Sequence, residues 1–362
     1  MTTSRIHRPL LLVGCTLLIA LPFLVGLGFG PAWVRVLDFV LLYILLALGL
    51  NIVVGFAGLL DLGYVAFFGV GAYVYALLAS PHLTSHFPAI AALFPAGLHG
   101  PLWLLLPLGA LVAGVFGILL GAPTLRLRGD YLAIVTLGFG EIIRIFLNNL
   151  YQPVNITNGA QGITQIDGLR VGPLALDRGL DLFGLRFSSL HLHYYLFLAL
   201  AMLVVFISLR LQDSRIGRAW VAIREDEIAA KACGINTRNV KLAAFAMGAS
   251  FGGIAGGLFA GFQEFVSPES FQLIDSIMIL CMVVLGGMGH VPGVILGAVL
   301  LTVLPELFRF GAGPAQQWLF GRVVVEPEAL RMLLFGLTLV VVMLLRPAGL
   351  WPEPRHRREL AQ

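Results

Sequence analysis

The sequence predicts an all-α polytopic membrane protein with about ten transmembrane helices, and three observations lead to this fold class. Of the 362 residues, 59% are hydrophobic and only 12% are charged, whereas soluble domains carry about 25% charged residues. The mean hydropathy is +0.93. Apolar runs of roughly 20 residues, the length that crosses a bilayer as a helix, recur along the chain. Because lipid offers the backbone no hydrogen bonds, such runs must be helical unless protein shields them.

Ten apolar runs meet this length rule. The first follows a basic N-terminus, but it is too long for the apolar part of a signal peptide, so we expect it to remain as a spanning helix. In chain order, the predicted spans are 10–29, 33–54, 64–80, 102–121, 130–150, 190–209, 241–262, 272–289, 293–310 and 330–346.

Lys and Arg residues are divided unequally between the two sides of the predicted bundle. Ten spans place both termini on one side, and the loops of that side contain 15 of these residues against seven in the opposite loops. Because cytoplasmic loops carry the excess of Lys and Arg, we expect both termini in the cytoplasm. The predicted regions are an N-terminal tail (1–9), a transmembrane domain (10–346) with outside loops 151–189, expected as a small cap, and 311–329, and a C-terminal tail (347–362).

Several functional classes lack support in the sequence. The net charge is only +4 and the basic residues are scattered, which argues against a nucleic-acid-binding protein. Cys15, Cys233 and Cys281 are far apart and lack C-x-x-C spacing, so they predict neither a disulfide framework nor a metal site. The chain contains no G-x-x-x-x-G-K-[ST] loop, so any ATP must be hydrolysed by another polypeptide.

Glycines recur at helical spacing within the span 241–262, in two ladders that lie one position apart. Small residues let neighbouring backbones approach closely, which favours helix association in lipid. We favour tight packing within one bundle over a face on which helices slide. The residues of the two ladders are Gly248, Gly252 and Gly256, and Gly253, Gly257 and Gly261; a weaker ladder consists of Gly109, Ala113, Gly117 and Gly121.

One segment, 211–238, is dense in charge and interrupts the apolar pattern. Asp213 or Ser214 can cap a helix N-terminus, and Gly234 stands where a helix end needs positive φ. The segment therefore predicts one short amphipathic helix on the cytoplasmic side. Because acids interrupt the bases and the apolar face is rich in alanine, docking to a soluble partner fits this helix better than lying on lipid.

The polar segment also carries the most specific resemblance to a known family. Its core, "GRAWVAIREDEIAAKACGIN", resembles the EAA loop of permeases in ATP-binding-cassette (ABC) importers. Over most of residues 40–350, the chain resembles the M-type permease subunit of the branched-chain amino acid importers. The segments that carry this resemblance are 217–236, 50–74 ("LNIVVGFAGLLDLGYVAFFGVGAYV"), 127–149 ("LRGDYLAIVTLGFGEIIRIFLNN"), 285–298 ("LGGMGHVPGVILGA") and 346–354 ("RPAGLWPEP").

The resemblance implies a multi-pass subunit of the bacterial inner membrane that is a transporter component and not an enzyme. It implies a heterodimer with a sister permease, two cytoplasmic ATPase subunits and a periplasmic substrate-binding protein. ATP and Mg would be bound by the partner ATPases, with no cofactor on this chain. The residues that correspond to the ATPase-docking motif are Gly217, Arg218, Ala219, Glu225, Glu227, Ala229, Ala230 and Gly234.

Two positions depart from the family pattern. Asp61, in "GLLDLG", stands where the family often has serine, and an acid there either changes the substrate or ion environment or faces water at the cytoplasmic end. The "KACG" that follows Ala230 replaces "EALG"-like residues, a change that an exposed helix tolerates.

Polar residues in or near the spans are candidates for a substrate pathway. Glu141, Arg144 and Asn148 share one face of the span 130–150. We favour a structural Glu141–Arg144 ion pair over a polar lining for the head of an amino acid, because buried charges in membranes are usually paired. The full candidate set is Asn51, Asp61, Glu141, Arg144 and Asn148.

The glycine-rich segments 55–63 and 285–293 occupy comparable places, each between spans on the cytoplasmic side. Transporters often carry such interrupted segments in matched repeats. We therefore hypothesise that spans two to five and seven to ten are related, inverted halves.

Three further functions stay open at the level of sequence. The same machinery would serve for urea, short amides or other amino acids. An ion- or proton-coupled secondary transporter would use Asp61 and Glu141 as coupling acids. An intramembrane enzyme ranks last, because the chain lacks H-E-x-x-H and any convincing Ser/His or paired-Asp arrangement.

Overall fold

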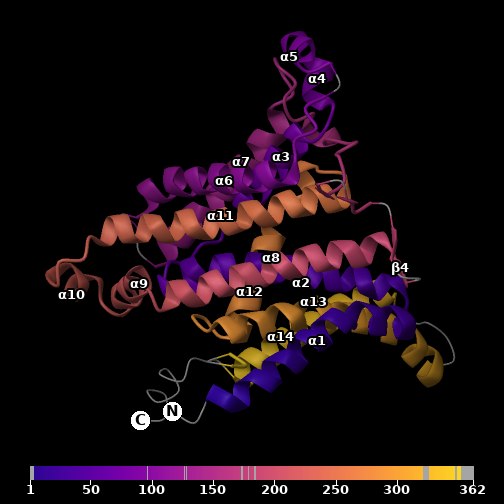
Figure 1. The fold of residues 1–362 in the computed structure, drawn as a ribbon. Helices are drawn as coiled ribbons and strands as arrows, with labels where there is room; N and C mark the ends of the chain where they lie inside the picture. Colours follow the sequence, from indigo (N-terminus) through magenta and orange to yellow (C-terminus); the bar gives the residue numbers. More distant parts are fainter. Residues whose placement is uncertain are drawn as a thin grey trace.

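The computed structural model is a bundle of long helices with two short β-hairpins at one end (Figure 1). The structure describes residues 4–95, 97–125, 127, 129–172, 174–177, 179–182, 185–320, 326–346 and 349–351. The long helices are α1 (Ser4–Phe29), α2 (Pro31–Asn51), α3 (Val65–Leu78), α6 (Leu102–Thr124), α7 (Asp130–Asn149), α8 (Ser189–Gln212), α11 (Thr237–Gln263), α12 (Leu273–Gly286), α13 (Val291–Phe320) and α14 (Pro327–Leu345).

Shorter elements connect them. A π-helix, η1, continues α2, and two small helical pairs lie between longer helices. Both β-hairpins are antiparallel. These elements are η1 (Ile52–Phe56), α4 (His82–His86), α5 (Pro88–Leu93), η2 (Gly159–Gln161), β1 (Arg170–Val171), β2 (Leu174–Ala175), β3 (Leu180–Leu182), β4 (Leu185–Phe187), α9 (Arg215–Glu225), α10 (Glu227–Ala232) and η3 (Pro268–Ser270).

Each of the ten predicted spans overlaps one of the long helices over most of its length. Within the described residues, six helical segments are long and apolar enough to cross a bilayer. α3 falls short because its 14 residues cover only about 21 Å at 1.5 Å per residue. α7, which carries Asp130, Glu141 and Arg144, is also outside the six segments. The fold is a multi-pass helical bundle, and the number ten stays a prediction. The six segments are Pro31–Phe56, Leu102–Thr124, Ser189–Gln212, Thr237–Gln263, Pro268–Gly286 and Val291–Gly311.

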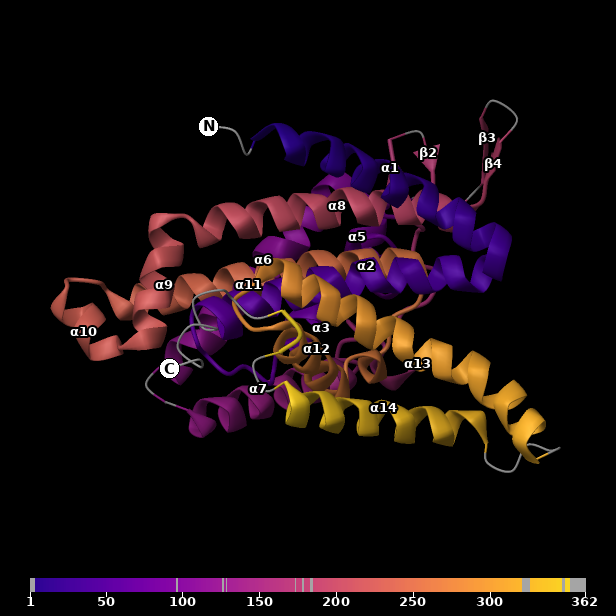
Figure 2. The same ribbon diagram turned by 90° about the horizontal axis from the view of Figure 1, so that it is seen from below.

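Helices α2 and α11 occupy the middle of the bundle (Figures 1 and 2). α11 packs along α6 and α3 and also contacts α2, which in turn contacts α8, α12 and α13. Within Pro31–Phe56, 89% of the most apolar stretch is buried. Apart from Arg35, Asp38 and Asn51, α2 is apolar on every side. A helix of this kind can be buried on every side, which is why the Leu-rich α2 becomes the central element.

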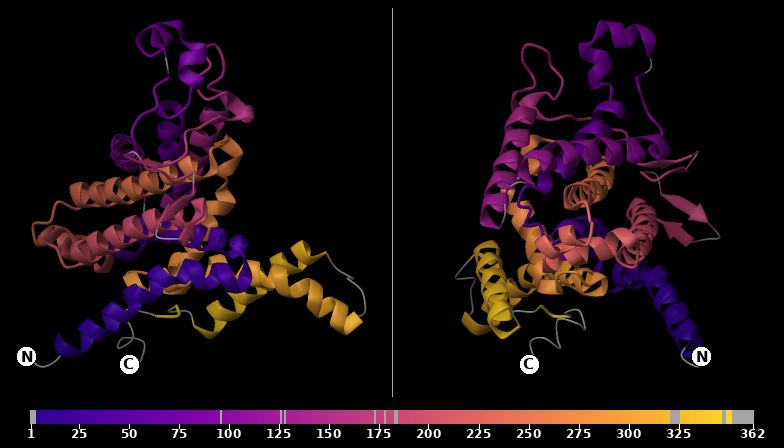
Figure 3. Two further views of the ribbon diagram at one scale, coloured as in Figure 1. Left: turned by 45° about the vertical axis from the view of Figure 1, so that its right-hand side comes forward. Right: turned by 90° about the vertical axis from the view of Figure 1, so that its left-hand side faces the viewer.

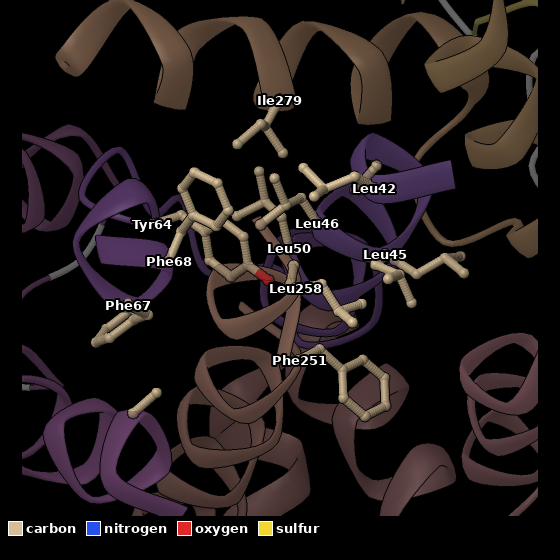
Figure 4. Packing of buried hydrophobic residues seen from close by; sticks show 14 of the residues in the cluster. Leu42, Leu45, Leu46, Leu50, Tyr64, Phe67, Phe68, Phe251, Leu258 and Ile279 are labelled. Atoms are coloured by element: carbon tan, nitrogen blue, oxygen red, sulfur yellow. The ribbon is translucent and has the colours of Figure 1, made fainter. Parts of the chain in front are cut away.

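The core lies where α2, α3, α11 and α12 meet (Figure 4). Leu46 and Leu50 of α2 and Ile279 of α12 are at most 1% exposed. Tyr64 enters this core at the start of α3, and its hydroxyl donates a 3.0 Å hydrogen bond to the carbonyl of Gly248. The buried phenol therefore has the partner that burial requires.

The glycine ladders of α11 lie against two different neighbours. A Cβ on Gly256 would stand 2.1 Å from the carbonyl oxygen of Phe68 in α3. A Cβ on Gly253 would stand 2.6 Å from the carbonyl oxygen of Gly109 in α6. The missing side chains thus let α11 touch the backbones of both helices, which supports the packing interpretation.

The two ends of the bundle differ (Figures 1 and 2). Helices α9 and α10, the beginning of α1 and the end of α14 lie at one end, while the β-hairpins lie at the other. The expected cap 151–189 contains both hairpins, and a bridge between Ile163 and Val266 ties it to the segment after α11. Where the segment 311–329 was expected as a loop, α13 continues to Phe320 and α14 begins at Pro327, and residues 321–325 lie outside the described residues. Helices α4 and α5 project from the body (Figure 3).

Candidate functional site

The polar segment forms two helices, α9 and α10, instead of the single helix expected. Asp226 separates them in an extended conformation (φ −152°, ψ 109°). Its Oδ1 accepts hydrogen bonds from the backbone N–H groups of Ile228 (2.7 Å) and Ala229 (3.1 Å). The single-helix prediction is wrong because Asp226 is an N-cap that starts a second helix, and not one more charge on the surface of the first.

The ends of this pair are fixed by residues that the sequence singled out. Ser214 is the N-cap of α9, and its Oγ accepts the N–H of Gly217 at 3.1 Å. A Cβ on Gly217 would lie 2.0 Å from the carbonyl oxygen of Leu211, so only glycine lets α9 fold back on the end of α8. Gly234 ends α10 with φ +83°, a conformation that suits glycine.

Trp220 attaches α9 to the bundle. Its side chain is fully buried, and Nε1 donates a 2.7 Å hydrogen bond to the carbonyl of Val240 at the start of α11. The indole also stacks on Phe56 of η1, with ring centroids 6.5 Å apart. Ile223 is buried one turn further along. α9 is therefore packed against both α11 and the π-helix that follows α2.

Glu227 attaches α10 in a different way. Its carboxylate lies 2.9 Å from Nζ of Lys241 and 3.1 Å from Nζ of Lys231, and Thr237 donates to it at 3.3 Å. Burial alone would raise the pKa of Glu227, but the hydrogen bonds and positive charges of the two lysines outweigh it and lower the pKa to about 2. The acid joins α10 to α11 within the chain.

The docking candidates divide by exposure. Gly217 and Ala230 are buried, and Ala219 and Glu227 are partly buried, so these four shape the segment. Ile228, which is not among the predicted docking residues, has an apolar side chain that is 71% exposed on α10. The sequence signal that could have identified it is an isoleucine within a segment dense in charge. The exposed candidates are Arg218, Glu225, Ala229 and Gly234.

Two pathway candidates, Asn51 and Asp61, are buried at the break between α2 and α3. Asn51 Oδ1 accepts the N–H of Gly289 at 2.9 Å. Asp61 Oδ1 accepts the N–H of Gly63 at 2.9 Å, and the residue borders a cavity of about 10 Å³ beside Thr136, roughly the volume that one water requires. Asp61 binds the non-helical backbone of this break, and Asn51 binds the non-helical loop between α12 and α13. Such backbone at membrane depth must be shielded by protein.

The other three candidates share a face of α7. Glu141 and Arg144 form an ion pair at 2.9 Å, with about a third of each side chain exposed. Asn148 borders a pocket of about 490 Å³ together with Tyr151 and Asn155. The structure thus brings Glu141, Arg144 and Asn148 together on a partly open surface. In the described part of the chain, no group of three or more His, Cys, Asp or Glu residues could hold a metal ion.

The comparisons with known proteins agree with this architecture. Residues 33–343 match the family described as the branched-chain amino acid transport system / permease component. One relative is the high-affinity branched-chain amino acid transport system permease protein LivM of Escherichia coli (strain K12). The two sequences are 42% identical in an alignment that covers 99% of this chain and 78% of that protein. The probable branched-chain amino acid transport permease protein LivM of Methanocaldococcus jannaschii is 28% identical to this chain. That alignment covers 86% of this chain and 91% of the relative.

A second type of permease is also similar. The high-affinity branched-chain amino acid transport system permease protein LivH of Salmonella typhimurium is 26% identical over 86% of this chain and 92% of its own length. No solved structure matches. With its family match extending over most of the helical bundle, the chain belongs to the branched-chain amino acid transport permease family.

Proposed function

We propose that the chain is one of two permease subunits of an ATP-driven importer that moves branched-chain amino acids across the bacterial inner membrane. The observation that carries this proposal is the polar α9–α10 pair, in a chain of this family that has no nucleotide-binding loop of its own. Energy must then reach the membrane helices through contact with a separate ATPase, and an exposed pair of short helices is suited to that contact.

The docking surface consists of the exposed side chains of α9 and α10. The exposed Arg218, Glu225 and Ile228 belong to these two helices, which lie at the end of the bundle where α1 begins and α14 ends (Figure 1). With all ten long helices spanning, this end faces the cytoplasm, in agreement with the excess of Lys and Arg in its loops. Two ATPase subunits, one for each permease, would bind there, together with their ATP and Mg.

The substrate pathway would follow α7, between this chain and a sister permease. Exposed isoleucines, among them Ile142 and Ile145, flank the Glu141–Arg144 pair on this helix. Apolar walls suit a branched aliphatic side chain, and the ion pair offers both charges to an amino acid's ammonium and carboxylate groups. A binding protein on the outer side would supply the affinity, so the chain itself needs no deep pocket.

The test is reconstitution of the chain with candidate sister permease, ATPases and binding protein in proteoliposomes. We expect ATP-dependent uptake of radiolabelled leucine, isoleucine and valine. Ile228→Asp should abolish co-purification of the ATPases by placing a charge in the docking surface. Leu93→Asp is the matched control: Leu93 is 76% exposed on α5, away from α9 and α10 (Figure 1), and its substitution should leave co-purification unchanged.

Competing functions give different outcomes in the same assay. Uptake of urea or short amides in place of branched-chain amino acids would keep the machinery and change the cargo. Uptake driven by a proton gradient, without any ATPase present, would overturn the proposed coupling and return Asp61 and Glu141 to the role of coupling acids.

A further inference from the structure

The central helix α2 ends in a π-helical turn, η1 (Ile52–Phe56). The N–H of Ala57 donates to the carbonyl of Ile52 at 3.2 Å, five residues back, and the N–H of Leu59, beyond the turn, donates to the carbonyl of Val53 at 3.0 Å, six residues back. Short π-helical turns are rare and occur frequently at functional sites. The sequence offered no signal for this turn beyond the glycines around it.

A side chain of α9 reaches this turn. Arg224, in the last turn of α9, donates a 2.6 Å hydrogen bond from Nη1 to the carbonyl oxygen of Gly55. Its aliphatic part lies on Gly58, where a Cβ would stand 2.8 Å from Arg224 Cγ. Gly58 has φ +67°, so the backbone at this contact takes a conformation that glycine permits and other residues rarely adopt.

The second glycine-rich segment meets the same point from the other half of the chain. Gly289, with φ +83°, donates its N–H to Asn51 Oδ1 at 2.9 Å. A Cβ on Gly289 would lie 3.1 Å from Arg224 Nη1, and a Cβ on Gly55 would lie 2.6 Å from the Gly289 nitrogen. One guanidinium therefore lies where the break after α2 touches the break between α12 and α13.

The loop around Gly289 is in turn held by the C-terminal segment. The N–H of Trp351 donates to the carbonyl of Gly286 at 3.1 Å, and Nδ1 of His290 lies 3.0 Å from the carbonyl oxygen of Trp351. A displacement at Gly55 would thus be passed to α12, α13 and the segment after α14 through hydrogen bonds and packed backbone, with no flexible side chain between Gly55 and Gly289.

We propose that Arg224 is the positioning residue through which the position of α9 controls the π-helical break, so that α2, α12 and α13 rearrange together. Trp220 packs α9 against α11 and against Phe56 of η1, and one turn further along Arg224 reaches the carbonyl oxygen of Gly55. When a partner displaces α9, the guanidinium of Arg224, which is always charged, moves with that helix. The carbonyl of Gly55 then either moves with the guanidinium or loses the hydrogen bond that Arg224 donates to it. Loss of that donor favours a shift of the i→i+5 pattern of η1 towards ordinary α-helix.

This inference rests on the ATP-driven function proposed above, and its test separates the two. The experiment uses the full complex with sister permease, ATPases and binding protein, and measures leucine transported per ATP hydrolysed. Arg224→Gln should retain the ATPases and their basal hydrolysis but lower the transported amount per ATP at least tenfold. Arg224→Lys keeps a charged donor, and it should recover part of the ratio. Arg238→Gln, at the exposed start of α11 and outside the docking surface on α9 and α10, is the matched control and should keep the wild-type ratio.

A second measurement reports on the break itself. In the wild-type complex, hydrogen exchange of residues 52–59 should differ between the ATP-bound and ADP-bound states. In Arg224→Gln this difference should vanish, which a merely structural role for Arg224 would not produce. If Arg224→Gln does not assemble, the same comparison is made on Arg224→Lys, where the difference should shrink. An unchanged ratio or an unchanged exchange difference overturns the proposal. A wild-type chain that neither binds ATPases nor transports overturns the proposed function instead.

Discussion

Helices α11 and α7 present opposite kinds of surface. α11 buries two glycine ladders against α2, α3 and α6, and the carbonyls of its neighbours lie where side chains would be. α7 buries Leu132, Thr136 and Ile143 but exposes Ile142, Ile145 and other apolar side chains beside a polar pair. The first surface is covered by other helices of the same chain, and the second leaves apolar side chains uncovered. The contrast separates helices that define the fold of this chain from a helix that is open to lipid or, as proposed above, to a partner.

The largest expected effect concerns the closed surface. In Gly256→Ala the new Cβ would lie 2.1 Å from the Phe68 carbonyl and 2.6 Å from the Ala72 nitrogen, and both are backbone atoms that cannot rotate away. We expect a loss of more than about 3 kcal/mol in the free energy of unfolding, measured by thermal unfolding of the detergent-solubilised chain.

The matched control for that variant lies on the open helix. At Gly138 of α7, a Cβ would have no other atom within 4 Å, so Gly138→Ala should be neutral or stabilising by up to about 1 kcal/mol through helix propensity. Equal unfolding temperatures for Gly256→Ala and the wild type would show that α11 is not packed as tightly as the structure has it.

The next effect concerns partner association. Ile142→Gln places an amide on the exposed face of α7, where Ile142 is 58% exposed. The Ile142→Gln chain should keep its fold, while the amount of sister permease that co-purifies with it should fall at least tenfold. Leu203→Gln on α8 is the control, because Leu203 is 51% exposed on a helix that lies across the bundle from α7 (Figure 2). An equal loss with both variants would contradict a partner surface on α7.

A smaller effect is expected at the Glu141–Arg144 pair. Because both side chains are about a third exposed, Glu141→Gln should change the free energy of unfolding by less than about 1 kcal/mol. Leucine uptake by the assembled complex should nevertheless fall several-fold, because one charge of the pathway is lost. Unchanged uptake together with a clear loss of stability would assign the pair to structure alone, which is the interpretation that the sequence favours.

The smallest effect is a pH dependence at the attachment of α10 to α11. The pKa of Glu227 is lowered from 4.5 to about 2, so the carboxylate stabilises the folded state above pH 4.5, and this contribution is lost as the pH falls from 4.5 towards 2. Limited proteolysis within α10 should therefore accelerate over that range in the wild type. The Glu227→Gln variant should already be cleaved rapidly at pH 7, and its cleavage rate should not change between pH 4.5 and 2. If this variant resists cleavage at pH 7 as well as the wild type does, the Glu227 carboxylate does not hold α10 to α11.

Much of the fold is predictable from local pattern. The apolar runs give a long helix in every one of the ten expected ranges, and Ser214 and Gly234 end the polar segment as their residue types predict. Failures arose where one residue had two local interpretations. Asp226 fits a helix surface as well as an N-cap, and only its bonds to Ile228 and Ala229 distinguish them.

The candidate site was less predictable. Glu227 carries a family motif that implies contact with a partner, yet its carboxylate is bound by Lys241 of its own chain. Exposure also separates docking residues that look alike in sequence: Ala229 is exposed and the adjacent Ala230 is buried. Helical periodicity predicts which residues share a face, but it does not say which face another helix covers.

By itself the sequence determined a membrane-spanning helical chain, a polar segment between two of its helices, and glycine faces for close packing, because apolar length, charge and residue size act over one or two helical turns. Only the tertiary structure decided that α9 reaches the break after α2 and that this break meets the loop at Gly289. Those contacts join residues 169 and 238 positions apart, and no local preference encodes a hydrogen bond whose two ends are brought together only when the whole bundle packs.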